Sequence, residues 1–334
     1  MKNFAGKVAF ITGGASGAGF GQAQIFSEAG MKIVIADVRQ DHMDNAAAYF
    51  KEKDAPVHFI KLDVMDRAGW AAAADEAERV YGTTPDLFMM TAGVIAAGPV
   101  EASTFEDFDW VIGVNFGGVI NGLVTMVPRM IKAGKGGHIA ATVSYGAFGA
   151  IPTVAPYTAA KAAALNLLES YYQAMKPYGI AVSAFMPANI KSNIHDSVLK
   201  TRPEHLQNTG YINTKEAADF HYTSMHAYGI EPREMAMRLK KGLEDEVFLI
   251  VPYPSAARMV ELDMQRFPLF TSVEGMRELE ELSSQPPTEE QKRIFLEKEN
   301  YEMGSIITPV TREDVGFGMA RKDLDWVSED KRAK

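Results

Sequence analysis

The 334-residue chain carries a net charge of −9 and contains no cysteine. These values exclude disulfides, thiolate catalysis and cysteine-based zinc sites, and neither half of the chain has the basic cluster that nucleic acid or an anionic membrane would attract. Because 47% of the residues are hydrophobic, the chain is long and apolar enough to bury a large core. We expect a cytoplasmic protein with no nucleic-acid and no membrane partner.

The first strand is predicted over residues 7–12, a nearly all-apolar run of the kind that is buried on both faces of a parallel sheet. The glycine-rich sequence TGGASGAG follows (residues 12–19), and then a helix to about residue 29. Such a loop lets a pyrophosphate approach the backbone, and the helix N-terminus offers free N–H groups. Turn formation also explains a glycine cluster, but its place after a first strand favours dinucleotide binding. The predicted cofactor contacts here are Gly13, Ala15, Ser16, Gly17, Ala18 and Gly19.

The second strand, residues 32–36, ends in Asp37, whose carboxylate can accept hydrogen bonds from the ribose hydroxyls of adenosine and would repel a 2′-phosphate. The alternative is a solvated aspartate at a strand end. Arg39 lies nearby, and an arginine there can bind a 2′-phosphate. Because Val38 directly follows the acid and the glycine loop has no basic residue, the sequence favours NAD over NADP.

The third strand, residues 57–62, is followed by Asp63 and Val64, both predicted to contact the cofactor. Asp63 either bonds the adenine ring or caps the next helix, predicted over residues 67–81. The fourth strand, residues 87–90, leads into Ala92 and Gly93, whose small size allows the cofactor to approach closely.

Ser103 and Glu106 have the spacing of a capping box, which predicts the start of a long helix that contains Asn115. A buried asparagine inside a helix is costly unless it is hydrogen-bonded. Two interpretations stay open: a structural asparagine that ties two elements together, or an active-site residue that positions a water behind Lys161.

An apolar run that begins near residue 138 is predicted to be the fifth strand, and Ser144 follows it. Tyr157 and Lys161 stand four residues apart in an alanine-rich predicted helix, so they share one face. A tyrosine ordinarily has a pKa near ~10, and a nearby cation lowers it. We therefore expect Tyr157, with its pKa lowered by Lys161, to act as the acid/base while the Ser144 hydroxyl holds a carbonyl or alcohol oxygen.

The sixth strand, residues 180–186, ends at Pro187, and a seventh is expected over residues 247–251. This alternation predicts an α/β fold with a doubly wound, parallel, seven-stranded sheet, a Rossmann fold.

We expect a catalytic domain over residues 1–255, with residues 193–230 as a substrate lid whose aromatic residues indicate an apolar substrate. The lid histidines lack metal-ligand spacing, so no metal is expected. Residues 256–334 are predicted to form a largely helical C-terminal extension packed on its own or a neighbouring subunit, with a disordered tail as the alternative.

Taken together, the TGGASGAG loop, Asp37, Asn115, Ser144 and the Tyr157–Lys161 pair resemble the short-chain dehydrogenase/reductase family over residues 4–255. The resemblance implies a catalytic set of Asn115, Ser144, Tyr157 and Lys161, with Lys161 also binding the nicotinamide ribose. It further implies a homotetramer or homodimer built on the helices after strands four and five. The cofactor contacts that it adds are Pro187, Ile190 and Ser192.

Two departures from the family pattern stand out. Met90 and Thr91 replace the first two residues of the usual Asn-Asn-Ala-Gly, which puts a sheet-bracing side-chain bond in doubt. Ala188 replaces the glycine that usually follows Pro187. Ser192 takes the place of a threonine and can still offer a hydroxyl to the nicotinamide amide.

The stretches GGASGAGFG, ADVRQDHMD and MPANIKSNIHDS look like the bacterial branch that includes the lignin β-aryl ether Cα-dehydrogenases, which oxidise benzylic secondary alcohols with NAD. The expected function is therefore an NAD-dependent interconversion of a hydrophobic, benzylic secondary alcohol and its ketone. One alternative is a ketone reductase for a polycyclic or steroid-like compound. Another is an NAD(H)-binding sensor that has kept the fold, against which the intact catalytic set argues.

Overall fold

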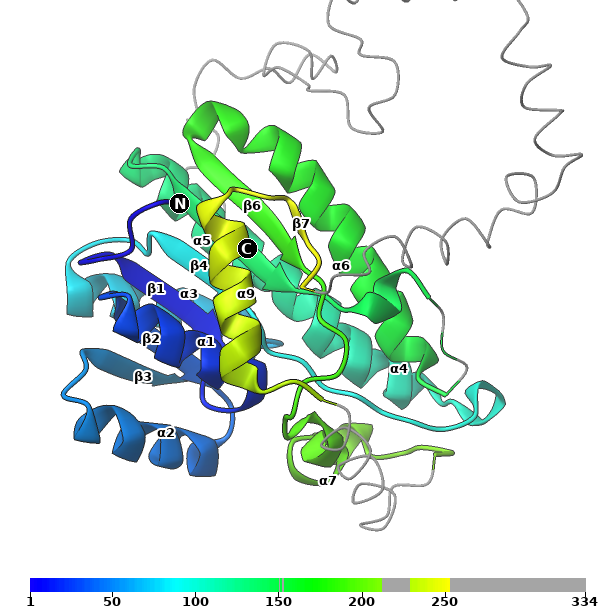
Figure 1. The fold of residues 1–334 in the computed structure, drawn as a ribbon. Coiled ribbons are helices and arrows are strands. Elements are labelled where there is room, and N and C mark those ends of the chain that lie inside the picture. The colour runs from blue at the N-terminus through cyan, green and yellow to red at the C-terminus, as the bar shows by residue number, and fades with distance from the viewer. Residues whose placement is uncertain (150, 152, 212–228, 253–334) are drawn as a thin grey trace, which may run out of the picture.

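The computed structural model describes residues 1–149, 151, 153–211 and 229–252. Seven parallel strands form one sheet in the order β3-β2-β1-β4-β5-β6-β7 (Figure 1). The strands are β1 (Val8–Thr12), β2 (Lys32–Asp37), β3 (Val57–Lys61), β4 (Leu87–Met90), β5 (Gly137–Thr142), β6 (Ile180–Phe185) and β7 (Leu249–Ile250). The predicted doubly wound parallel sheet is confirmed.

The strand order reverses between β1 and β4, which pair side by side although β2 and β3 intervene in the chain. At such a switch point the loops that follow the two strands diverge to opposite faces of the sheet and leave a crevice at its carboxyl edge. The glycine loop follows β1, and Thr91, Ala92 and Gly93 follow β4, so both predicted cofactor segments border this crevice.

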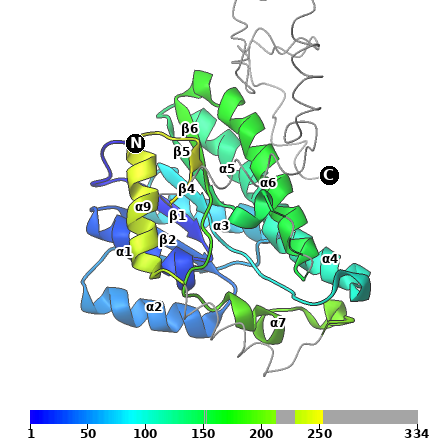
Figure 2. The same ribbon diagram turned by 45° about the vertical axis from the view of Figure 1, so that its right-hand side comes forward.

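The helices cover both faces of the sheet, as Figure 2 shows with α1 and α9 on one side and α5 and α6 on the other. Successive residues of a strand point to opposite faces, so Phe10 joins the core beneath α3 and α5 while Ile11 joins the core beneath α1 and α9. The helices are α1 (Gly17–Glu28), α2 (Gln40–Glu52), α3 (Arg67–Tyr81), α4 (Phe105–Ile112), α5 (Gly118–Ala133), α6 (Ala155–Ala174), α7 (Ser197–Lys200) and α9 (Pro232–Glu244).

The capping box predicted for Ser103 and Glu106 is wrong by one residue. Thr104 caps α4: its hydroxyl accepts a hydrogen bond from the Asp107 N–H, and the Asp107 carboxylate accepts one from the Thr104 N–H at 2.9 Å. Ser103 is engaged elsewhere, because its hydroxyl donates to the Val100 carbonyl and bonds the Tyr211 hydroxyl. Two candidate caps stand side by side in the chain, and contacts with distant residues decide between them.

Asn115 does not lie in a regular α-helix. It lies in a π-helical stretch, Gly113–Gly117, that joins α4 to α5. A π-helical turn inserts extra backbone into a helix and often occurs at functional sites. Here it turns the Asn115 side chain toward the segment after β4.

The continuous helical run Phe105–Ala133 is long and apolar enough to cross a membrane by length and composition alone, with a mean hydropathy of 1.6 over its most apolar window. Half of that window is buried, and core helices of soluble proteins pass the same test. The predicted C-terminal extension, residues 256–334, lies outside the described residues.

Candidate active site

The glycine loop packs directly against the segments around it. A Cβ atom on Gly13 would lie 2.7 Å from the Ala92 Cα, and one on Gly19 would lie 2.1 Å from the Gly13 carbonyl oxygen. Gly13 and Gly17 have φ values of +63° and +49°, which favour glycine. The Ser16 side chain makes no capping hydrogen bond at the start of α1. The loop therefore brings bare backbone, and a helix N-terminus that no side chain caps, to the crevice.

Asp37 is buried at the end of β2, with 8% of its surface exposed, so the solvated alternative is wrong. Its carboxylate accepts hydrogen bonds from the Ala15 N–H at 3.2 Å and the Arg39 N–H at 3.0 Å. Burial raises the pKa of Asp37, and the backbone N–H bonds oppose that rise. These bonds fix the carboxylate next to the glycine loop.

Ser144, Tyr157 and Lys161 come together as predicted, although they belong to separate elements. Ser144 follows β5, and its hydroxyl accepts a hydrogen bond from the Gly146 N–H at 3.1 Å and bonds the Tyr157 hydroxyl. Tyr157 and Lys161 lie on α6, and the Lys161 ammonium is 5.6 Å from the centre of the Tyr157 ring. The three side chains meet beside the carboxyl ends of β4 and β5.

Lys161 is buried and donates a hydrogen bond to the Thr142 carbonyl at 2.8 Å. Burial lowers the pKa of Lys161 to about 8, because a low-dielectric environment disfavours the charged form. Lys161 is thus a cation at neutral pH that a modest rise in pH neutralises.

The prediction that the pKa of Tyr157 lies below its ordinary value is wrong in this structure. Burial raises the pKa of Tyr157, and the hydrogen bond with Ser144 only partly opposes the rise. The Lys161 ammonium donates to the Thr142 carbonyl, and desolvation of the phenolate is the largest cause of the raised pKa of Tyr157. Tyr157 is therefore held as the protonated phenol.

Asn115 is fully buried and uses both ends of its amide on one residue. Its Nδ2 donates to the Val94 carbonyl and its Oδ1 accepts from the Val94 N–H, both at 2.8 Å. The interpretation as an asparagine that ties two elements together is confirmed. A Cβ on Gly93 would meet both Asn115 Oδ1 and Lys161 Nζ, at 3.1 and 3.6 Å, so Asn115 also lies beside Lys161. Its role in positioning a water stays a prediction.

A polar network that the sequence did not reveal braces the sheet beneath Lys161. The Thr91 hydroxyl donates to Gln22 Oε1 at 2.7 Å and lies 3.0 Å from the Thr142 hydroxyl, which also bonds Gln22 Nε2. The Thr12 hydroxyl accepts from the N–H groups of Thr91 and Ala92. Thr91 therefore restores the bracing that its departure from the family pattern put in doubt. The only signal for it in the sequence was Gln22, a polar residue among the otherwise apolar residues of the α1 face that packs on the sheet.

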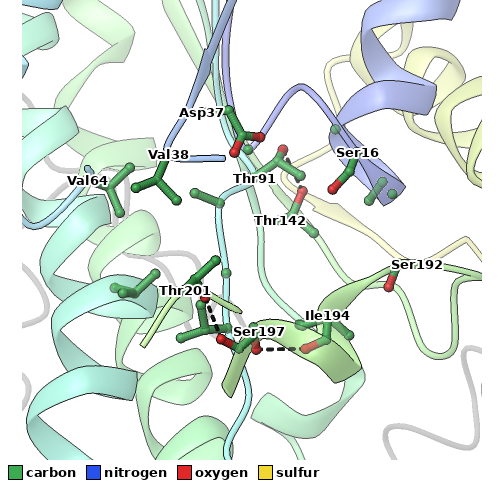
Figure 3. A pocket seen from close by; sticks show the side chains of 18 of the residues that line it. Ser16, Asp37, Val38, Val64, Thr91, Thr142, Ser192, Ile194, Ser197 and Thr201 are labelled. Atoms are coloured by element: carbon green, nitrogen blue, oxygen red, sulfur yellow. Dashed lines mark hydrogen bonds between the residues drawn. The ribbon is translucent and has the colours of Figure 1, made fainter. Parts of the chain in front are cut away.

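One groove brings together most of the predicted cofactor residues. Figure 3 shows Asp37, Val38 and Val64 on one side and Ile194, Ser197 and Thr201 across from them. Ala15 does not line the groove but anchors Asp37. Asp66, not Asp63, caps α3. The Asp63 carboxylate instead accepts a hydrogen bond from the Met65 N–H. The predicted residues in the groove are Gly13, Ser16, Gly17, Ala18, Gly19, Asp37, Asp63, Val64, Ala92, Gly93, Tyr157, Lys161, Pro187, Ile190 and Ser192.

These features fit a dinucleotide: close-packed glycines, a helix N-terminus without a side-chain cap, and a buried carboxylate at the end of β2. Across the residues that the structure describes, no three His, Cys, Asp or Glu side chains are grouped to hold a metal ion. The fold and the site define the class of doubly wound proteins with a dinucleotide-type glycine loop that carry a tyrosine next to a lysine.

Comparison with known proteins narrows this class. The model of the short chain dehydrogenase family matches residues 7–203, and the chain belongs to this family. It is 48% identical over 284 residues to the C alpha-dehydrogenase of Sphingobium sp. (strain SYK-6), covering 83% of this chain and 92% of the relative. The resemblance to the Cα-dehydrogenase branch is thereby confirmed, and the protein is an oxidoreductase that acts on alcohols.

Solved structures agree with this assignment. The apo form of LigD from Sphingobium sp. strain SYK-6 is 41% identical, with a TM-score of 0.66 over 86% of this chain and all of that chain. A short chain dehydrogenase/reductase from Burkholderia phymatum, in complex with NAD, is 30% identical, with a TM-score of 0.75 over 80% of this chain and 96% of that chain. A nicotinamide cofactor is therefore the class of cofactor that the groove takes.

Proposed function

We propose that the enzyme oxidises a hydrophobic, benzylic secondary alcohol to its ketone and passes the hydride to NAD. The observation that carries this proposal is the meeting of Ser144 and Tyr157, both half-buried, with the buried Lys161 beside the groove. The resemblance to the lignin β-aryl ether Cα-dehydrogenases, together with a relative named C alpha-dehydrogenase, supports an alcohol at the carbon next to an aromatic ring.

A bound NAD would supply the acceptor for the hydride of the carbinol carbon and, in its oxidised form, a positively charged ring. The proton of the alcohol hydroxyl goes to the Tyr157 oxygen, so that the substrate loses one hydride and one proton. Tyr157 must be a phenolate to accept that proton, and the positively charged ring that a bound NAD would add to the Lys161 ammonium would oppose the effect of burial on the pKa of Tyr157. Ser144 holds the substrate oxygen, and the Thr142 carbonyl keeps the Lys161 ammonium in place.

Ketone reduction is the second candidate direction, and one observation favours it. Because burial raises the pKa of Tyr157, the side chain stands as the protonated acid that reduction requires. Reduction would take a hydride from NADH and a proton from Tyr157.

Asp37 supports NAD rather than NADP, since its fixed carboxylate would repel a 2′-phosphate. We also propose a cytoplasmic homodimer or homotetramer with no membrane partner. Exposed apolar side chains on the helices after β4 support it, since Phe105 on α4 and Val124 on α5 are 87% and 64% exposed.

The test is NADH formation from NAD with a panel of benzylic, arylglycerol ether, steroid and short aliphatic secondary alcohols, and the reverse panel of ketones with NADH. The proposal expects a benzylic preference that disappears in Tyr157→Phe. A preference for steroid ketones would instead establish the polycyclic alternative. If neither panel changed the NADH concentration while the protein still bound NADH, the sensor interpretation would remain.

A further inference from the structure

Arg39 reaches from the cofactor edge of the sheet to the segment predicted as the lid. It directly follows the Asp37–Val38 pair, and its Nη1 lies 3.4 Å from Asp196 Oδ1 in the turn Ile194–Asp196. These partners stand 157 residues apart in the chain. Their side chains are only 10% and 14% exposed, so this ion pair is much better shielded from solvent than an ordinary surface pair.

The remaining donors of Arg39 are also directed at carboxylates. Its Nε donates to Asp41 Oδ1 at 2.8 Å, and its Nη2 bonds the other oxygen of the same carboxylate. Asp196 in turn bonds Lys200 at 2.6 Å through its second oxygen. The guanidinium is therefore held between two carboxylates, Asp41 in the first turn of α2 and Asp196 on the lid segment.

The groove places this cluster where the identity of the cofactor is decided. Asp37, Val38, Arg39 and Asp196 all line it, and Figure 3 shows Asp37 and Val38 across from the lid residues that flank Asp196. An additional phosphate on the ribose next to Asp37 would need a free cation. The cation that stands there already serves Asp41 and Asp196, and both of those groups would repel the phosphate.

We propose that Asp196 is a specificity-determining residue of the lid: by holding Arg39 it withholds the arginine from a 2′-phosphate and so selects NAD against NADP. This inference rests on the proposed function, which assigns the groove to a nicotinamide dinucleotide. Selection then depends on two segments, Asp37 on the sheet and Asp196 on the lid.

The lid segment has other attachments, so removal of the Asp196 charge should leave it folded. The Ser197 hydroxyl accepts from the Ile95 N–H at 3.3 Å and donates to the Ile194 carbonyl at 2.7 Å. Arg202 forms a buried ion pair with Asp107 at 2.7 Å, with side chains 1% and 0% exposed. These contacts attach the segment to the stretch after β4 and to α4 without the help of Arg39.

The experiment measures binding rather than turnover. NADH and NADPH are titrated by fluorescence into the wild type, Asp196→Asn, Lys200→Met and the double variant Asp196→Asn/Arg39→Gln. We expect the ratio of the NADPH Kd to the NADH Kd to fall roughly tenfold in Asp196→Asn, as the gain of one charge-assisted hydrogen bond predicts. Lys200→Met is the matched control: it removes the exposed partner of the same carboxylate and should keep the wild-type ratio.

The double variant separates the explanations. If Arg39 binds the phosphate once released, Arg39→Gln must cancel the gain. An unchanged ratio in Asp196→Asn, or a gain that survives Arg39→Gln, would overturn the inference while leaving NAD binding intact. A wild-type protein that binds neither nucleotide would instead refute the proposed function. Equal thermal unfolding midpoints show that the variants are folded.

Discussion

A buried ionisable side chain lies at each end of β5, and burial lowers the pKa of both with different consequences at neutral pH. At the carboxyl end, the Thr142 carbonyl accepts a hydrogen bond from Lys161, and burial lowers the pKa of Lys161 to about 8. At the amino end, His138 is fully buried against Ser183 of β6, and burial lowers the pKa of His138 to about 3.

The hydrogen bonds explain why Lys161, at the carboxyl end of β5, is suited to a role in the reaction, while His138, at the amino end, affects only stability. The Ser183 hydroxyl donates to the Val247 carbonyl, so it accepts from the His138 Nε2–H. His138 Nδ1 is thereby left as a bare acceptor, buried and with no partner among the described residues. Lys161 instead borders the groove and keeps its charge at neutral pH. A buried base with a pKa near the working pH can take part in proton transfer, whereas one with a pKa near 3 stays neutral.

Tyr157→Phe should produce the largest effect, because it removes the group that moves the proton. We expect turnover to fall by about 10²–10⁴, the usual contribution of a positioned acid/base. Steady-state rates with the best alcohol measure the fall, while NADH titration and the thermal midpoint should match the wild type. A fall of less than threefold would contradict the assignment.

Lys161→Met should also lower turnover, and it should change how stability depends on pH. Since the folded pKa of about 8 lies below the ordinary 10.5, the unfolded chain binds more protons between these values. The wild type therefore gains stability as the pH rises from 8 to 10.5, and the variant should lose that gain. Urea unfolding at pH 8 and pH 10 compares the two slopes. Identical slopes would show that Lys161 is not desolvated in solution.

His138→Leu tests the other end of β5. Because the folded pKa of His138 is depressed from 6.5 to about 3, its neutral form contributes full stability above pH 6.5, and that contribution is lost as the pH falls toward 3. We expect the wild type to lose up to about 4 kcal/mol over this range through His138, and His138→Leu to lose much less.

Urea midpoints at pH 7 and pH 4.5 supply the measurement. The matched control is His58→Asn, since His58 is part-exposed and paired with Glu76. His58→Asn should leave the acid sensitivity of the wild type in place. If His138→Leu remained as acid-sensitive as the wild type, the buried histidine would not be the cause.

Thr91→Val should have the smallest effect, because it removes one hydroxyl from the network that supports Thr142. We expect a loss of about 1 kcal/mol of unfolding free energy per hydrogen bond removed, and a fall in turnover of only a few fold. Thr91→Ser keeps the hydroxyl and should restore turnover. A Ser variant as impaired as the Val variant would show that loss of the hydroxyl does not by itself explain the fall in turnover.

The sequence by itself determined the parts that depend on short stretches of chain. Apolar runs located all seven strands, and α3 begins and ends where its pattern predicts. The glycine loop and the shared helix face of Tyr157 and Lys161 could also be predicted, because loop geometry and helical periodicity follow from neighbouring residues. Chain order alone therefore indicated the doubly wound sheet and the acid/base pair.

Only the tertiary structure decided which distant groups meet and how buried they are. It attached Lys161 to Thr142, Asn115 to Val94, and Arg39 to Asp196. It also set the direction of the Tyr157 pKa, which the nearby lysine alone predicted wrongly. Partner choice and desolvation depend on packing between elements far apart in the chain, and local patterns carry no record of that packing.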